Sequence, residues 1–399
     1  EQAIAVYYQA AQSIPPGSPD LPAYLNNLAT GIKARYKLTG QVDDLEKVIA
    51  FQQQVIQETS PDEPDFAMYL SNLANGLCAR YSRTGDLPDL EQAIAYHNQA
   101  VAATPPRSRH LPMYLSNLGL ALRDHYARTG QLDKLNQAID FFREAVAHTP
   151  PAAPTRMAYL NNLAIGLKSR YDRMGQFPDL EETIAIFEQV IARLPSSSPA
   201  LPLYISNFGA ALRERYARTG QLEDLQQAIA LYTQAVDLTA PDAAGLAARL
   251  NSLGTGLIDR YYRTGQMADL EQSIDVHTQA VERPPADSPD LPMLLSNRGL
   301  GLRARYRRTG QPADLEQAIA DYTSAVEHTP PGSLHRPTYL TGLGGALRAR
   351  YEYTGELADL EQAIVNYKEA VQQTPSDHPD RPIYLNALGL GLSDRYTRT

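Results

Sequence analysis

The sequence has no tryptophan, a single cysteine and only eight histidines. One cysteine, Cys78, excludes an intrachain disulfide, and the scattered histidines lack the spacing of a zinc site. We therefore expect neither a metal nor a cofactor. No apolar run reaches the roughly 18 residues of a membrane-spanning helix, and no basic leader precedes an apolar segment. These features favour a cytoplasmic protein.

Basic residues are also scarce relative to acidic ones. The chain carries 36 Lys and Arg against 45 Asp and Glu, for a net charge of −9. Because nucleic acids and anionic membranes attract basic surfaces, this balance argues against both as partners.

The main positive feature is an internal repeat of 45 residues that runs through the chain without an insertion. We expect a single continuous array over 1–399. Its predicted units are a partial 1–20, complete units 21–65, 66–110, 111–155, 156–200, 201–245, 246–290, 291–335 and 336–380, and a partial 381–399.

Each unit predicts two helices. In the first, over residues 21–39, apolar residues fall on one stripe, and Gly40 supplies a left-handed C-cap. The second begins at Asp44, where Gln or Glu three residues later in most repeats indicates a capping box. Pro61 closes the unit because proline cannot continue a helix.

Neither helix buries both of its flanks alone, so neighbouring hairpins must stack. Small residues recur where we expect backbones to approach, among them Gly119, Gly166, Gly209 and Gly254. This stacking predicts an all-α solenoid.

The chain resembles the tetratricopeptide repeat family. The resemblance rests on these residues in one unit: Asn117-Leu118-Gly119, Gly130, Ala138-Ile139, Ala145-Val146 and Pro150. It covers the whole chain and implies an α-solenoid with a right-handed superhelix of helix-turn-helix repeats. The family's usual unit is shorter, about 34 residues. The longer unit, with Tyr-Leu-x-Asn-Leu and Arg-Tyr-x-Arg-Thr-Gly blocks, is similar to arrays that precede CHAT-type protease domains in fungi and bacteria.

A nearly uniform sector of the first helix carries Asn27 and Arg35. Two interpretations are open. The uniform row is either a ligand ladder or a structural row, in which the asparagine bridges adjacent helices and the arginine pairs with residues such as Asp44 and Glu46.

A second sector, at the equivalents of positions 23, 26, 30, 33 and 37, differs from unit to unit. The resemblance implies that it lines a concave groove that binds extended peptides. A basic row at position 33 would favour an acidic segment. Alternatively, these side chains form i,i+4 pairs on a solvated face, such as Lys168 with Asp172 and Arg348 with Glu352. The predicted groove residues are Lys33, Arg123, Lys168, Arg213, Arg303 and Arg348, with Asn75 and Thr255.

No residue pattern supports catalysis. Helix capping explains acids such as Asp89 and Asp179, while His97 and His277 occupy aromatic core positions. The leading hypothesis is a non-catalytic scaffold that binds a protein or an extended acidic peptide.

The alternative hypothesis is head-to-tail self-assembly into a filament. A third hypothesis is a sensor array within a larger CHAT-type protease. The expected end-to-end contact residues are Ile4, Tyr7 and Ala11 at one end and Leu385, Leu388 and Leu392 at the other.

Overall fold

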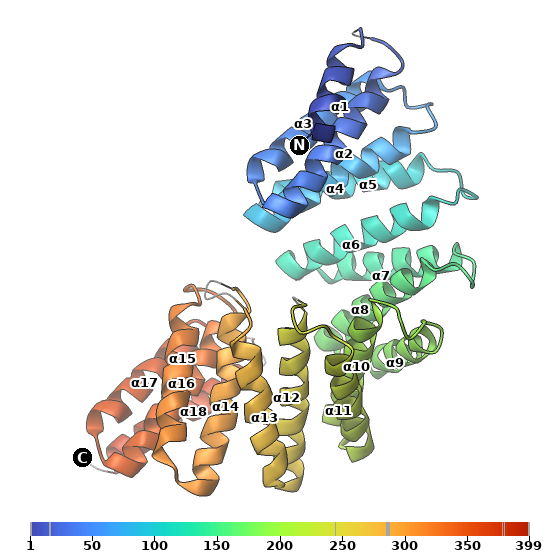
Figure 1. Ribbon diagram of the computed structural model, residues 1–399. Coiled ribbons are helices and arrows are strands. Elements are labelled where there is room, and N and C mark those ends of the chain that lie inside the picture. The colour runs from blue at the N-terminus through green and yellow to red at the C-terminus, as the bar shows by residue number, and fades with distance from the viewer. Residues whose placement is uncertain are drawn as a thin grey trace. The chain divides into compact units, whose positions relative to one another are not determined.

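The protein is described by a computed structural model that covers residues 2–15, 17–243, 245–284, 288–376, 378 and 380–397. These residues form eighteen α-helices and no strand, which confirms the all-α repeat fold (Figure 1). By its internal contacts the chain divides into two compact units, Glu1–Arg193 and Leu194–Thr399, which we describe separately.

In each unit the helices follow one another as first and second helices of successive repeats. The first unit contains α1 (Gln2–Gln12), α2 (Leu21–Thr39), α3 (Val42–Glu58), α4 (Phe66–Thr84), α5 (Leu87–Ala102), α6 (Leu111–Thr129), α7 (Leu132–Ala147), α8 (Arg156–Met174) and α9 (Phe177–Ile191). The second contains α10 (Leu201–Thr219), α11 (Leu222–Asp237), α12 (Leu246–Thr264), α13 (Met267–Val281), α14 (Leu291–Thr309), α15 (Pro312–Glu327), α16 (Arg336–Thr354), α17 (Leu357–Gln372) and α18 (Arg381–Tyr396). None of these helices is both long and apolar enough to cross a membrane, as judged over the described residues.

The turn between the two helices of a repeat is the predicted glycine cap. Gly40 has φ 69°, and its N–H donates to the carbonyl of Tyr36 at 2.8 Å. Only glycine adopts this left-handed conformation without a Cβ clash.

The predicted capping box is wrong. The helix α3 begins at Val42, its N-cap is Gln41, and no side chain caps it. Asp44 therefore lies inside the first turn, where both of its oxygens accept hydrogen bonds from Arg35. The sequence places an acid near the positive end of the helix dipole, but an arginine rather than the backbone holds it.

The recurring glycines make room mainly for side chains, several of them rings, and a Cβ built on Gly209 would also lie 3.2 Å from the backbone oxygen of Ala228. A Cβ built on Gly119 of α6 would lie 2.6 Å from the ring of Phe142, and one built on Gly166 of α8 would lie 3.4 Å from the same ring. The ring of Phe142, which is fully buried, thus occupies a slot between two successive first helices. Tyr232 fills the equivalent slot between Gly209 and Gly256.

First helices also contact one another, unlike second helices. In the first unit α4 contacts α6 and α6 contacts α8, and in the second unit the contacts run from α10 through α12, α14 and α16 to α18. Within the described residues no two second helices contact each other to this extent. The first helices therefore line the inner side of the curve that each unit follows.

Candidate functional site

The uniform arginine sector is structural. In seven repeats Nε and Nη2 of the arginine donate to the two carboxylate oxygens of an aspartate in the first turn of the following helix, at 2.6–2.9 Å. These aspartate side chains are at most 14% exposed. The pairs are Arg35–Asp44, Arg80–Asp89, Arg170–Asp179, Arg215–Asp224, Arg260–Asp269, Arg305–Asp314 and Arg350–Asp359. We call this contact the repeat clamp.

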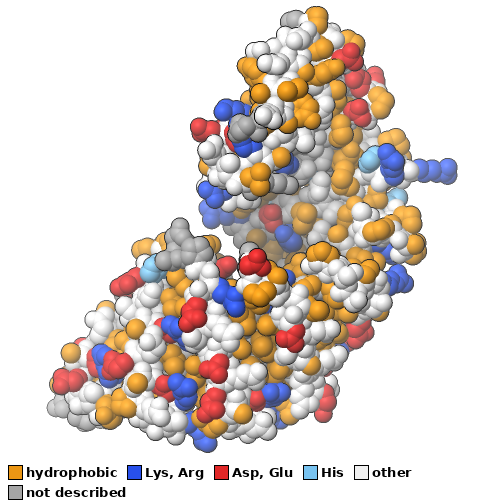
Figure 2. Space-filling model, viewed as in Figure 1, with side chains coloured by type: hydrophobic (Ala, Val, Ile, Leu, Met, Phe, Trp, Pro, Cys, Tyr) orange, Lys and Arg blue, Asp and Glu red, His pale blue; other side chains and the backbone are white. Residues whose placement is uncertain are grey.

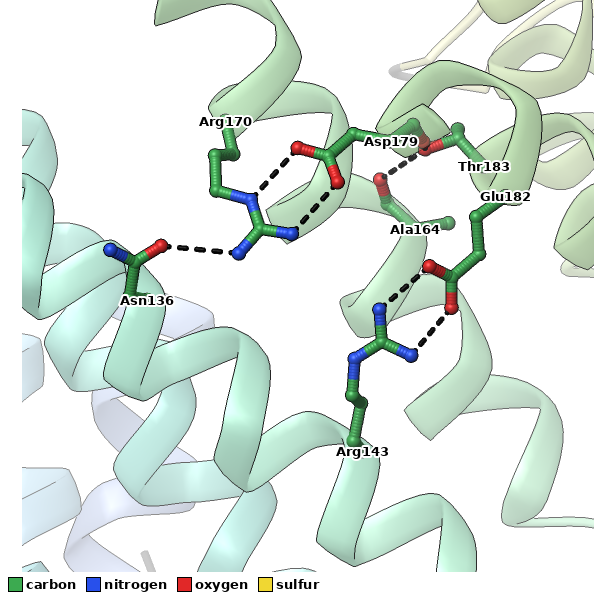
Figure 3. A network of polar contacts seen from close by, with 7 residues as sticks. All are labelled: Asn136, Arg143, Ala164, Arg170, Asp179, Glu182 and Thr183. Carbon is green, nitrogen blue, oxygen red and sulfur yellow. Dashed lines mark hydrogen bonds and ion pairs between the residues drawn. The ribbon is translucent and has the colours of Figure 1, made fainter. Parts of the chain in front are cut away.

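The repeat clamp also joins neighbouring repeats. Figure 3 shows the guanidinium of Arg170 between Asp179 of its own repeat and Asn136 of the preceding one, whose amide oxygen accepts a hydrogen bond of 3.2 Å. Arg80 reaches back in the same way to Glu46 at 2.7 Å. Because these arginines are occupied within the protein, the ligand-ladder interpretation of this row is not needed.

The asparagine row bridges successive first helices, as predicted for the structural interpretation. Asn72 donates to Asn26 at 2.9 Å, and Asn297 donates to Asn251 at 2.7 Å. Asn117 and Asn162 instead donate to the serine of the preceding first helix.

The remaining candidate surface is the inner face of the first helices, where the structure separates the predicted basic row into paired and unpaired members. Lys168 pairs with Asp172 at 2.9 Å, as expected for an i,i+4 contact. Arg348 pairs with Glu352 at 3.1 Å and also with Asp394 of the next first helix.

Arg213 extends this pattern across repeats, because its Nε donates to Asp259 of the next first helix at 2.6 Å. Arg123 contacts the adjacent Asp124 at 3.1 Å. Lys33 makes interactions within the protein as well.

Two uncharged candidates complete the predicted groove. Asn75 is half-buried on α4, and the hydroxyl of Thr255 donates to the carbonyl of Asn251 in its own helix at 2.8 Å. Neither residue forms a hydrogen bond with a basic side chain of the described residues.

Arg303 of α14 differs from the other basic residues. It forms no hydrogen bond or ion pair with any residue that the structure describes. Its guanidinium lines a cavity of about 340 Å³ between α14, α16 and α18. Leu300 and Ile383 line the same cavity, so that the predicted positions 30, 33 and 23 do share one surface.

Apolar side chains follow the inner face at position 23. Met113, Leu203, Met293 and Ile383 are 38%, 46%, 38% and 61% exposed. Figure 2 shows hydrophobic side chains interspersed with side chains of both charges on the face in view. The sequence analysis placed position 23 on this face but did not note that several of its residues are apolar, which could have been seen from the residue types alone.

The predicted end-to-end residues only partly point outward. Ile4 and Ala11 pack against clusters that include Leu28 and Leu25 of α2. Leu388 and Leu392 pack against Tyr351 of α16. All four are half-buried because the same stripe packs against a neighbouring helix of the chain, and their part in an end-to-end contact stays a prediction. Tyr7 is 38% exposed beside Gly31, and Leu385 is 48% exposed.

The titratable groups of the core have no catalytic arrangement. His97 is fully buried, neither ring nitrogen has a partner, and burial lowers its pKa to about 4. Burial raises the pKa of the Cys78 thiol to about 12, which leaves it protonated and unreactive. Over the described part of the chain, no cluster of three His, Cys, Asp or Glu side chains could hold a metal ion.

The comparisons with known proteins agree with this fold. The profile of the tetratricopeptide repeat matches residues 66–106 and 338–380. The human IFIT1 dimer with PPP-AAAA is 14% identical with a TM-score of 0.55, over 92% of this chain and 72% of that chain. The apo form of the quorum sensor NprR from B. thuringiensis is 16% identical with a TM-score of 0.56, over 92% of both chains. Comparison with curated proteins gives no match.

At these identities the structural likeness shows the fold alone. The chain is a TPR-like helical repeat protein, a class that generally serves as a scaffold for protein interactions and typically carries no catalytic centre.

Proposed function

We propose that the protein is a non-catalytic scaffold that binds an extended, acidic protein segment along the inner face of its first helices. The observation that supports this most directly is the row of exposed apolar side chains at position 23, next to the basic row at position 33. Stacking of the repeats uses neither Met113 nor Leu203 as a core residue, since both stay more than a third exposed. Such a surface suits a segment that alternates apolar and acidic residues.

Most of the basic row is balanced by acids of the protein itself, which sharpens the proposal. A ligand carboxylate near Arg213 has to compete with Asp259 at 2.6 Å, and one near Lys168 has to compete with Asp172. The apolar contacts therefore supply most of the affinity, while Arg303, which has no ion pair among the described residues, selects an acidic segment.

A peptide array that varies apolar and acidic content tests this function. We expect binders to combine both residue types, and we expect Leu203→Asp and Met293→Asp to weaken them by about tenfold or more. Val365→Asp on α17 is the matched control, because Val365 is 52% exposed but lies on a second helix. Binding that survives both inner-face variants, or that the control removes equally, refutes the inner face as the binding surface.

Two narrower hypotheses from the sequence remain predictions. Head-to-tail self-assembly predicts that light scattering rises steeply with protein concentration, whereas a strictly monomeric particle contradicts it. Association with a CHAT-type protease domain predicts that such a domain is encoded in the same gene product, which the full-length transcript decides.

A further inference from the structure

Arg303 is the member of the basic row whose expected partner is missing. In the two neighbouring cases, Arg213 and Arg348 bind an aspartate one position further along in the next first helix. The equivalent residue opposite Arg303 is Ala349, which is 8% exposed. The guanidinium is thus half-buried and forms no ion pair with a described residue.

Small residues on α16 also hollow out the space in front of this guanidinium. A Cβ on Gly345 would lie 2.0 Å from Nη1 of Arg303, so a larger residue there would displace the guanidinium from its present position. A Cβ on Gly342 would lie 2.4 Å from the ring of Tyr322, at a position where six other first helices carry asparagine and α12 and α18 carry Ser252 and Ala387. The asparagine bridge is therefore interrupted between α14 and α16, and the cavity of about 340 Å³ lies at this interruption.

One tyrosine lines the cavity, and a second lies near the guanidinium without lining it. The side chain of Tyr322 lines the cavity, is only 2% exposed and has no hydrogen-bond partner within the described chain. The hydroxyl of Tyr367 would lie 3.8 Å from the same Cβ on Gly345 that meets Arg303. Burial raises the pKa of both phenols, so they stay protonated and can donate.

The rest of the lining contains apolar residues, uncharged polar residues such as Asn297 and Thr341, and one acid. Leu300 and Ile383 form its apolar wall. Asp380 also lines the cavity, but it is exposed and contributes from the N-cap of α18. The interior thus offers a cation and donors beside an apolar wall, which matches a carboxylate attached to an apolar residue or next to one.

We propose that this cavity, the Arg303 pocket, binds a carboxylate of a peptide, with an adjoining apolar side chain against Leu300 and Ile383. The guanidinium donates to the carboxylate as Arg213 donates to Asp259 and Arg348 donates to Asp394. The inference rests on the proposed function and specifies one anchor point of that surface, in the second unit.

Small probes test the Arg303 pocket without a natural partner. Acetyl-Leu-Glu-amide carries the carboxylate on a side chain, acetyl-leucine carries it at the chain end, and acetyl-Leu-Gln-amide is the neutral match. Binding is followed through the Nε–H signal of Arg303 in arginine-labelled protein, assigned by its loss in Arg303→Gln. We expect at least one carboxylate probe to bind about tenfold more tightly than the glutamine probe, and the better of the two identifies the source.

Three variants separate this pocket from general charge effects. Arg303→Gln removes the cation, and Gly345→Ala displaces the guanidinium without changing the charge. Ala349→Asp supplies the missing internal partner. We expect each to weaken the carboxylate probe by about tenfold. The control Arg308→Gln removes an exposed basic residue of the same helix outside the basic row and should change the affinity by less than about twofold.

The outcomes are distinguishable. Equal binding of the glutamine probe, equal or tighter binding of inorganic phosphate, or unchanged affinity in Arg303→Gln overturns the Arg303 pocket. If array-selected peptides still lose affinity in Leu203→Asp under those results, the scaffold function stands and only the pocket fails. Circular dichroism of each variant confirms that the helices are retained, and Gly345→Ala keeps the test decisive should Arg303→Gln fail to fold.

Discussion

The repeat clamp makes a quantitative prediction at Arg260 and Asp269. The two side chains form two hydrogen bonds of 2.6 and 2.9 Å, and the aspartate is 6% exposed while the arginine is 26% exposed. Arg260→Ala leaves a buried carboxylate without its cation, which we expect to cost about 2–3 kcal/mol of unfolding free energy. The double variant with Asp269→Ala removes both charges and should cost less than the sum of the single variants. We expect a coupling of about 1.5 kcal/mol after allowance for the exposed part of the arginine.

The assay has to report local stability, because repeat arrays do not unfold as one cooperative unit. Hydrogen exchange of the amides in α12 and α13 gives the free energy of opening at the site. Arg263→Ala, one turn further on and exposed, should change it by less than about 0.5 kcal/mol. Single-variant effects that add to within about 0.3 kcal/mol would show that the pair contributes nothing and would refute the reasoning.

Three further predictions follow from the core. Gly119→Ala should destabilise the protein by about 1–3 kcal/mol, because the added Cβ would lie 2.6 Å from the ring of Phe142 on α7. Gly389→Ala, whose Cβ would meet no atom within 4 Å, should stabilise it by up to about 1 kcal/mol. Equal shifts of the two variants in thermal melts would contradict the ring slots. Burial lowers the pKa of His97 to about 4 in the folded state from 6.5, so its contribution to stability is complete above pH 6.5 and falls by up to about 3 kcal/mol as the pH drops towards 4. His97→Phe should remove this dependence from hydrogen exchange in α5, whereas the amides around His277, whose pKa burial also lowers to about 4, should keep theirs. Arg298→Leu should cost about 3 kcal/mol of unfolding free energy, because it leaves the carboxylate of Asp321 buried without its cation. The double variant with Asp321→Leu should be near neutral. Equal losses of unfolding free energy in the single and double variants would refute an ion-pair role.

The local repeat structure was predictable because each signal acts within a few residues. The left-handed cap at Gly40 follows from the missing Cβ, and the stripe that includes Leu28 follows from helical periodicity. The start of the second helix was misplaced, since Asp44 suits either an N-cap or the first turn. Only the distance to Arg35, nine residues earlier in the chain, decides between them.

The candidate site was predictable as a surface but not as a set of available side chains. Periodicity places Arg213, Arg303 and Arg348 in one row, and the structure keeps them on the same face of the first helices. Whether each is free depends on a residue 46 positions later, at Asp259, Ala349 and Asp394. Contacts between repeats lie outside any single helical window, so the sequence pattern alone gave all three the same role.

Repetition makes departures from the pattern informative, because every repeat serves as a reference for the others. In the third complete repeat the clamp arginine is replaced by His125 and its aspartate by Lys134. Both partners changed together, so no unpaired carboxylate remains. The ring of His125 instead lies 3.9 Å from Glu91. Arg298 and Asp321 show the same behaviour, since a cation at a leucine position is matched by an acid at an apolar position.

Arg303 departs in the opposite way, because only one side of its contact changed. Ala349 removes the carboxylate while the cation is kept, and Gly345 preserves the room that the guanidinium needs. A half-buried cation without a partner costs desolvation free energy that stacking does not recover. The paired replacements elsewhere show that a neutral residue at this position would fit the fold. A carboxylate from outside the chain would offset this cost by supplying the charge that Ala349 lacks, which is the physical basis for placing a ligand carboxylate there.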